Sequence, residues 1–135
     1  TKGWWDAYSL FLNGEADMVL SYSTSPAYHM IAEGKNNYKA AEFKEGHYVQ
    51  IEVAGLLNSS SNKDLARSFL EFILTDDFQS VIPTTNWMYP VIQYEPLPDS
   101  FRISPKPKAV PELSPSLVYK QNKKWLKAWS RAMSE

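Results

Sequence analysis

Hydrophobic positions along the chain follow helical spacing in some segments and strand-like spacing in others. Large apolar side chains recur at helical intervals over residues 3–15, and Asn13-Gly14 provides a stop signal, which predicts a first helix. Short apolar or alternating runs predict strands over 17–22, 38–43 and 47–57. Helices that alternate with short apolar strands favour a layered α/β fold. The same reasoning predicts further helices over 26–33, 62–74, 76–82 and 115–133.

Local start and stop signals set the predicted boundaries. Ser25 is a favourable N-cap and Pro26 a favourable first helical residue for the second helix. Pro83 is expected to end the helix over 76–82, because proline lacks the N–H that a helix interior needs. The proline-rich stretch at about 95–115 is expected to be an extended surface loop.

Two of the predicted helices are amphipathic. Leu65, Phe69 and Phe72 share one side of the helix over 62–74. Trp125 and Trp129 lie one turn apart in the last helix, and the lysines of that helix fall mainly on its other face. Both apolar sides are therefore expected to contribute to a core.

Composition excludes some classes of function but does not identify the function. Hydrophobic residues make up 44% and charged residues 21% of the 135 residues, and the formal net charge is −1. No basic patch stands out, so nucleic acid is not an expected partner. The absence of cysteine excludes disulfides, thiolate metal ligands and a cysteine nucleophile from this chain. His29 and His47 lack a companion at metal-ligand spacing and are expected to be surface or packing residues.

The junction Ser21–Pro26 carries the strongest chemical signal. It places several hydroxyl groups and free amides at a predicted helix N-terminus, where partial positive charge favours an anion such as phosphate. Tyr22 and Tyr28 bracket the junction and supply aromatic faces or phenol hydroxyls. Ordinary capping of a surface helix explains the same residues, and the residue types alone do not separate the two interpretations.

Two aromatic segments are further candidates. The segment Thr84–Pro90 combines turn-forming residues with large rings, which suits either a ligand-contacting loop or a tryptophan packed under the proline-rich loop. Trp4 and Trp5 point about 100° apart on a helix, so one can pack while the other faces a cleft. No Gly-rich phosphate loop, serine elbow or metal motif is present, and no catalytic arrangement emerges.

At the level of whole motifs, the chain resembles the C-terminal part of the thiamine-binding periplasmic proteins of bacterial ABC importers. The resemblance rests on LSYSTSPAYH at 20–29, EGHYVQIEVA at 45–54, IPTTNWMYPV at 82–91 and the closing KKWLKAWSRAMSE. It runs over nearly the whole chain and weakens across 94–113. It implies part of a three-layer, type II solute-binding fold with two lobes, in the periplasm and without a cofactor.

The resemblance also implies a ligand and the residues that hold it. Thiamine, or its mono- or diphosphate, is expected between the lobes and is handed to a membrane permease. The resemblance implies that Trp4 lies in the cleft and that the hydroxyl-rich segment at the strand-to-helix junction binds the ligand. It also implies that two further aromatic residues line the same cleft. The ligand-binding residues expected on this basis are Trp4, Tyr22, Ser23, Thr24, Ser25, Tyr28 and Trp87.

The sequence leaves two questions open, namely whether the chain is a fragment and which function it has. The abrupt start at Thr1, close to Trp4 and Trp5, suggests a fragment whose N-terminal lobe lies upstream. About half of the ligand site is then expected to be missing from this chain. A thiaminase-like enzyme of similar fold, or a receptor for another cationic or phosphorylated solute, are the alternatives to a thiamine receptor. The resemblance itself implies a binding protein and not an enzyme.

Overall fold

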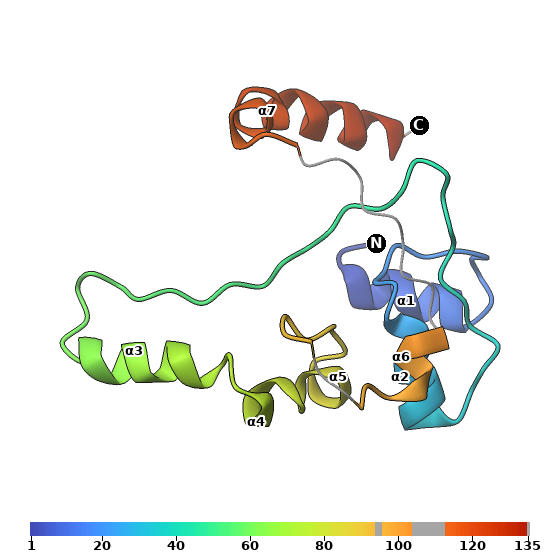
Figure 1. The fold of residues 1–135 in the computed structure, drawn as a ribbon. Coiled ribbons are helices and arrows are strands. Elements are labelled where there is room, and N and C mark those ends of the chain that lie inside the picture. The colour runs from blue at the N-terminus through green and yellow to red at the C-terminus, as the bar shows by residue number, and fades with distance from the viewer. Residues whose placement is uncertain (94–95, 104–112, 135) are drawn as a thin grey trace.

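The computed structural model describes residues 1–93, 96–103 and 113–134 and shows seven helices there. Figure 1 shows that α1, α2 and α6 lie together, that α3 and α4 extend away from them, and that α7 lies apart from that group. A long extended segment runs from the end of α2 to the start of α3. The helices are α1 (Trp4–Leu12), α2 (Ser25–Glu33), α3 (Lys63–Phe72), α4 (Asp76–Gln79), α5 (Ile82–Thr85), α6 (Asp99–Ile103) and α7 (Pro115–Ala132).

Glycine and proline explain most helix boundaries. After α1, Gly14 adopts φ 78°, and Gly34 ends α2 with φ 65°; both are left-handed conformations that glycine adopts without steric cost. The predicted N-cap of α2 was wrong by one residue. Thr24 occupies the N-cap, Ser25 is the first helical residue and Pro26 the second, where proline's missing N–H is still harmless.

Proline also begins helices where a stop was expected. Pro83 does not terminate a helix but sits in the first turn of α5. Its fixed φ is compatible with a helical start, and its N–H would have been unpaired there in any case. Within the proline-rich stretch, residues 99–103 form the short helix α6, so this part is not an extended loop. Residues 104–112 of the predicted loop lie outside the described residues.

The three predicted strands do not form within the described residues. Residues 17–22, 38–43 and 47–57 follow extended or irregular paths, and no β-strand is assigned in the described ranges. A strand requires a neighbouring chain segment to pair its N–H and C=O groups. The apolar pattern of 47–57 therefore has no sheet to join here, and Val53 is 88% exposed.

The described core lies where α1, α2 and α6 meet. Tyr8 of α1, Ala27 and His29 of α2, and Phe101 of α6 are buried. The helices α2 and α6 pack directly against each other. This small core holds the N-terminal end of α2 and its hydroxyl-rich approach in place.

The amphipathic helices α3 and α7 bury no residue within the described ranges, contrary to the prediction. Leu65 and Phe69 of α3 are exposed, as are Trp125 and Trp129 of α7. Apolar faces of this extent normally pack against another surface. No described helix is both long and apolar enough to cross a membrane.

Candidate functional site

A cleft of about 1010 Å³ opens beside the N-terminal end of α2. It brings together side chains from four separate parts of the chain. Its described walls are Trp4, residues 20–24, residues 47–50, residues 88–90, Ile92, Gln93 and Leu97. Four of the predicted binding residues, Trp4, Tyr22, Ser23 and Thr24, therefore meet in one cavity.

Trp4 is the tryptophan that faces this cleft. Its indole Nε1 donates a hydrogen bond to the carbonyl oxygen of Leu20 at 3.1 Å, which fixes the ring. The ring centroids of Trp4 and Tyr8 lie 4.8 Å apart. Trp4 is 41% exposed while Trp5 is 70% exposed and does not line the cleft. Of the two adjacent indoles, Trp4 therefore faces the cavity and Trp5 does not.

Thr24 contributes a buried hydroxyl to the wall. The residue is only 3% exposed, and its Oγ1 has no hydrogen-bond partner among the described residues. Although Thr24 is the N-cap of α2, its side chain does not cap the helix. A buried hydroxyl without a partner is costly, so this oxygen is available to a ligand or a water molecule.

Ser25 is placed differently from its neighbours. Its Oγ lies 2.7 Å from Ser21 Oγ, within hydrogen-bond distance. It lines an adjoining, smaller cleft of about 400 Å³ that also includes Tyr8, Phe11 and Tyr38. Tyr22 and Ser23 line both clefts, whereas Thr24 lines only the large one and Ser25 only the smaller one.

Tyr28 and Trp87 contact each other and are not among the residues that line the large cleft. Their ring centroids lie 5.0 Å apart at an interplanar angle of 85°. Trp87 adopts φ 57°, a left-handed conformation that bulky residues rarely occupy. Asn86 Nδ2 donates to Glu52 Oε2 at 3.1 Å, which ties this loop to the extended segment 47–57. The pair is therefore not part of the cleft wall, and the chain after Trp87 enters the wall at Met88.

Tyr89 was missed by residue-by-residue reasoning, although the segment Thr84–Pro90 was a candidate. Its hydroxyl is buried without a partner among the described residues, and burial raises the pKa of its phenol above the ordinary value. Its ring packs edge-on against Phe101 of α6, with centroids 5.6 Å apart. Both Tyr89 and Thr24 line the large cleft, and each carries a buried hydroxyl without a partner among the described residues.

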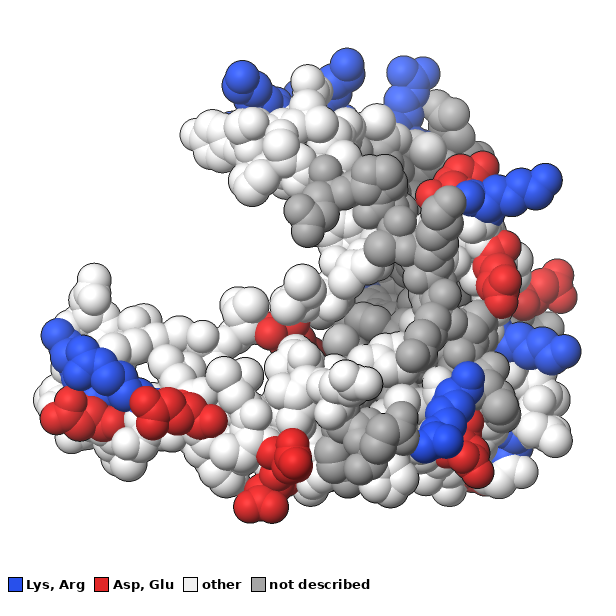
Figure 2. Space-filling model, viewed as in Figure 1, with Lys and Arg blue, Asp and Glu red and all other residues white. Residues whose placement is uncertain are grey.

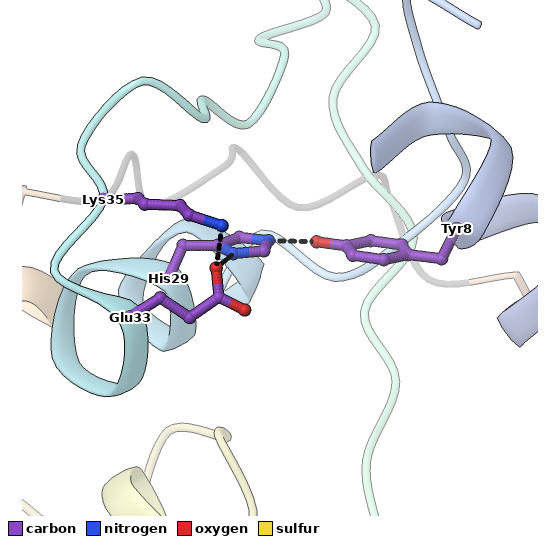
Figure 3. Close-up of polar contacts among 4 residues, drawn as sticks. All are labelled: Tyr8, His29, Glu33 and Lys35. Carbon is purple, nitrogen blue, oxygen red and sulfur yellow. Dashed lines mark hydrogen bonds and ion pairs between the residues drawn. The ribbon is translucent and has the colours of Figure 1, made fainter. Parts of the chain in front are cut away.

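A polar network runs from the buried Tyr8 and His29 to the exposed Glu33 and Lys35 (Figure 3). Tyr8 Oη lies 2.8 Å from His29 Nε2, and His29 Nδ1 lies 2.9 Å from Glu33 Oε2. The same Glu33 oxygen pairs with Lys35 Nζ at 2.9 Å. The hydrogen bond from His29, and then that from Lys35, lower the pKa of Glu33, whereas burial raises the pKa of Tyr8. His29 is thus a packing residue, as expected from the sequence.

Charge is distributed around the edges of the molecule in Figure 2. Lys and Arg side chains lie over α7, and charged groups of both signs lie over α3. The described atoms around the recess between these two helices are mostly uncharged. No group of three His, Cys, Asp or Glu side chains that could hold a metal occurs in the part of the chain that the structure describes.

A family model, known proteins and a solved structure all match this chain. The family model for the bacterial extracellular solute-binding proteins matches residues 1–80. The "Thiamine-binding periplasmic protein" of Escherichia coli (strain K12) is 51% identical over 134 residues, which are 99% of this chain and 41% of that protein. Its namesake from Brucella melitensis is 47% identical over 99% of this chain and 40% of its own length.

The solved structure of a "Periplasmic thiamin binding protein" superimposes on the whole chain. The TM-score is 0.88 at 50% sequence identity, and the match covers 42% of that protein. The chain therefore spans about two fifths of the length of the relatives it matches. The extended segments 17–22 and 38–57 lie within this match even though they pair with no strand in the described residues.

Proposed function

Because the chain belongs to the family of bacterial extracellular solute-binding proteins, we propose that it is the C-terminal part of a periplasmic receptor for thiamine. The receptor binds thiamine outside the cytoplasmic membrane and delivers it to the permease of an ABC importer. One observation carries the proposal: the large cleft unites Trp4 and Tyr22 with the hydroxyls of Ser23 and Thr24 at the start of α2. The names and the 51% and 50% identities of the relatives support it.

The aromatic residues of the cleft suit the cationic part of thiamine. Its thiazolium ring is positively charged, and an aromatic face contributes roughly 0.5 to 2 kcal/mol to binding such a cation. Trp4 is held by its hydrogen bond to Leu20, so it presents a fixed face to the ligand. A ring that is already ordered loses little entropy on binding.

The hydroxyls suit the other end of the ligand. We assign the hydroxyethyl group, or its mono- or diphosphate ester, to Ser23 and Thr24 at the N-terminus of α2. Tyr89 lines the same cleft and carries a further hydroxyl, which is buried without a partner among the described residues. Ser25 is not part of this assignment because its Oγ pairs with Ser21 and lines the smaller cleft. The ligand is the transported cargo, and the proposal requires no cofactor.

The remainder of the site is proposed to come from the other lobe of the receptor. The relatives are more than twice as long as this chain, which covers 40% to 42% of them. The exposed apolar sides of α3 and α7 are consistent with surfaces that pack against further protein. Residues 1–135 alone are therefore expected to bind thiamine far more weakly than the complete gene product.

Calorimetry on the complete gene product tests the proposal. Thiamine, its monophosphate and its diphosphate are titrated separately, with choline and a polyamine as other cationic solutes. Sub-micromolar binding of thiamine or its esters, with no heat from the other cations, supports the assignment. Tight binding of a polyamine without thiamine binding contradicts it and favours a receptor for another cationic solute.

Enzymatic cleavage is the second function to be separated. A thiaminase-like enzyme of similar fold would use a cysteine nucleophile, and this chain contains no cysteine. Incubation of the complete gene product with thiamine and an added nucleophile, followed by chromatography for the free pyrimidine, distinguishes the two. Unchanged thiamine at stoichiometric binding is the result expected of a receptor.

A further inference from the structure

We infer that His29 is a positioning residue that holds Trp4, in the wall of the thiamine cleft, and the Tyr28–Trp87 pair in one arrangement. The inference rests on the proposed function, because it concerns how the ligand-binding rings are ordered. His29 does not line the large cleft itself. It is completely buried and lies between the elements that carry Trp4 and Trp87.

A continuous series of ring contacts connects those two tryptophans through His29. On one side, Trp4 packs on Tyr8 at 4.8 Å, and Tyr8 lies nearly coplanar with His29, end to end through its hydroxyl, with ring centroids 5.9 Å apart and an interplanar angle of 5°. On the other side, His29 meets Tyr28 edge-on at 5.2 Å, and Tyr28 meets Trp87 at 5.0 Å. His29 is the ring at which the two halves of the series join.

Hydrogen bonds fix the orientation of the imidazole within this series (Figure 3). An ionised Glu33 carboxylate only accepts, so His29 Nδ1 carries the proton and donates to it. In the neutral ring Nε2 is then an acceptor, and the hydroxyl of Tyr8 donates to it at 2.8 Å. Both ring nitrogens are therefore engaged, one toward α1 and one within α2.

Further packing prevents the imidazole from turning. Tyr38, from the extended segment after α2, lies against His29 with ring centroids 4.0 Å apart. Loss of the Tyr8 hydroxyl would leave the rings in place but release their relative orientation. A change at His29 is thus expected to disturb Trp4 and Trp87 together, although neither touches the imidazole.

The test uses the complete gene product with Tyr8→Phe, His29→Leu and Glu33→Gln. Tyr8→Phe removes only the donor and is expected to raise the Kd for thiamine about twofold to tenfold, the usual effect of one hydrogen bond. His29→Leu is expected to raise it further, whereas Glu33→Gln retains an oxygen acceptor for Nδ1 and is expected to bind nearly as wild type. The losses should be equal for thiamine and thiamine diphosphate, because Trp4 faces the ring system that both ligands share.

A stability-matched control separates positioning from simple destabilisation. Phe78 packs between Phe69 and Phe72 at the α3–α4 junction, away from the cleft-lining residues, so Phe78→Leu should lower the Tm and leave the Kd unchanged. Titrations are run well below the lowest Tm, and the near-UV circular dichroism of the indoles is recorded without ligand. Altered indole signals with weakened binding in Tyr8→Phe support the inference.

Several outcomes would overturn it. Wild-type affinity and an unchanged indole spectrum in Tyr8→Phe would show that the hydroxyl does not order the rings. Weakened binding in Phe78→Leu to the same extent would reduce the effect to lost stability. If the wild-type protein binds no thiamine, the proposed function fails separately, and the ligand-free indole spectrum still decides whether His29 orders the tryptophans.

Discussion

Replacing Thr24 by valine should stabilise the ligand-free protein and weaken ligand binding at the same time. The change is nearly isosteric and exchanges the hydroxyl for a methyl group. Thr24 is 3% exposed and its Oγ1 has no partner among the described residues, so the substitution removes no observed hydrogen bond. The opposite signs of the two effects make the prediction specific, because most buried substitutions destabilise a protein.

The magnitudes follow from the environment of this oxygen. A buried hydroxyl without a partner costs about 1–3 kcal/mol, so its removal should raise the free energy of unfolding by about 1–2 kcal/mol. One kcal/mol corresponds to about 2–4 °C in Tm for proteins of 150–250 residues. Loss of a hydrogen bond to the neutral hydroxyethyl group of thiamine should raise the Kd about twofold to tenfold. A bond to a charged phosphate is stronger, so thiamine diphosphate should lose about tenfold or more.

Differential scanning calorimetry without ligand and titration calorimetry with both ligands measure the two effects. Thr75→Val is the matched control, since Thr75 is also a helix N-cap but is exposed and donates to the carbonyl of Phe72 at 2.7 Å. That control should not gain stability and should not change either Kd. A lower Tm for Thr24→Val, with unchanged affinity for both ligands, would refute the assignment of this hydroxyl to the ligand.

Four further predictions concern other parts of the structure. Trp4→Ala should raise the Kd for thiamine and its phosphates by the same factor, about twofold to thirtyfold, in titration calorimetry, and Trp87→Ala should raise it less because Trp87 does not line the cleft. At position 87, glycine should give a higher Tm than alanine, because φ 57° costs an L-residue about 1 kcal/mol or more; a lower Tm for glycine would contradict this. Because the pKa of Glu33 is lowered, its ionised carboxylate stabilises the protein at neutral pH, and this stabilisation is lost as the pH falls through the lowered pKa. Glu33→Gln should therefore flatten the acid side of a profile of Tm against pH. Residues 1–135 alone should bind the hydrophobic dye ANS and self-associate in sedimentation experiments, unlike the complete gene product, because the apolar sides of α3 and α7 are exposed.

Local sequence signals predicted the helices well because their causes are local. Gly14 and Gly34 mark the ends of α1 and α2 through backbone conformations that glycine favours. Ser114 accepts a hydrogen bond from the amide of Leu117 and opens α7 just before Pro115. Such signals depend on a few neighbouring residues, so they can be recognised in the sequence without knowledge of the rest of the fold.

Most mispredicted features depend on distant partners, whereas the errors at Pro83 and at the N-cap of α2 are local. The strand-like pattern of 47–57 needs a neighbouring strand, and none is present in the described residues. Trp125 and Trp129 form an apolar stripe, but only a packing partner turns such a stripe into a core. Pro83 was assigned to a helix end because proline's position relative to the first turn cannot be deduced from its presence alone.

The candidate site shows the same division. The hydroxyl-rich junction was predicted from residues that are adjacent in sequence, and Ser23 and Thr24 do share a cleft with Trp4. Tyr89 was missed because its burial depends on Phe101 of α6, twelve positions further along the chain. The separation of Ser25 from Thr24 reflects the turn of the backbone at the start of α2, which residue types do not encode.

The unpaired path of 47–57 makes this segment an internal reporter of assembly. Amide protons without acceptors exchange with solvent deuterium at close to the rate of an unstructured peptide. The amides of Val49, Ile51 and Val53 should therefore exchange rapidly in residues 1–135 alone. In the complete gene product, pairing of this segment with other strands is expected to protect the same amides through sheet hydrogen bonds. Deuterium uptake at these few positions would then report when this segment joins a sheet.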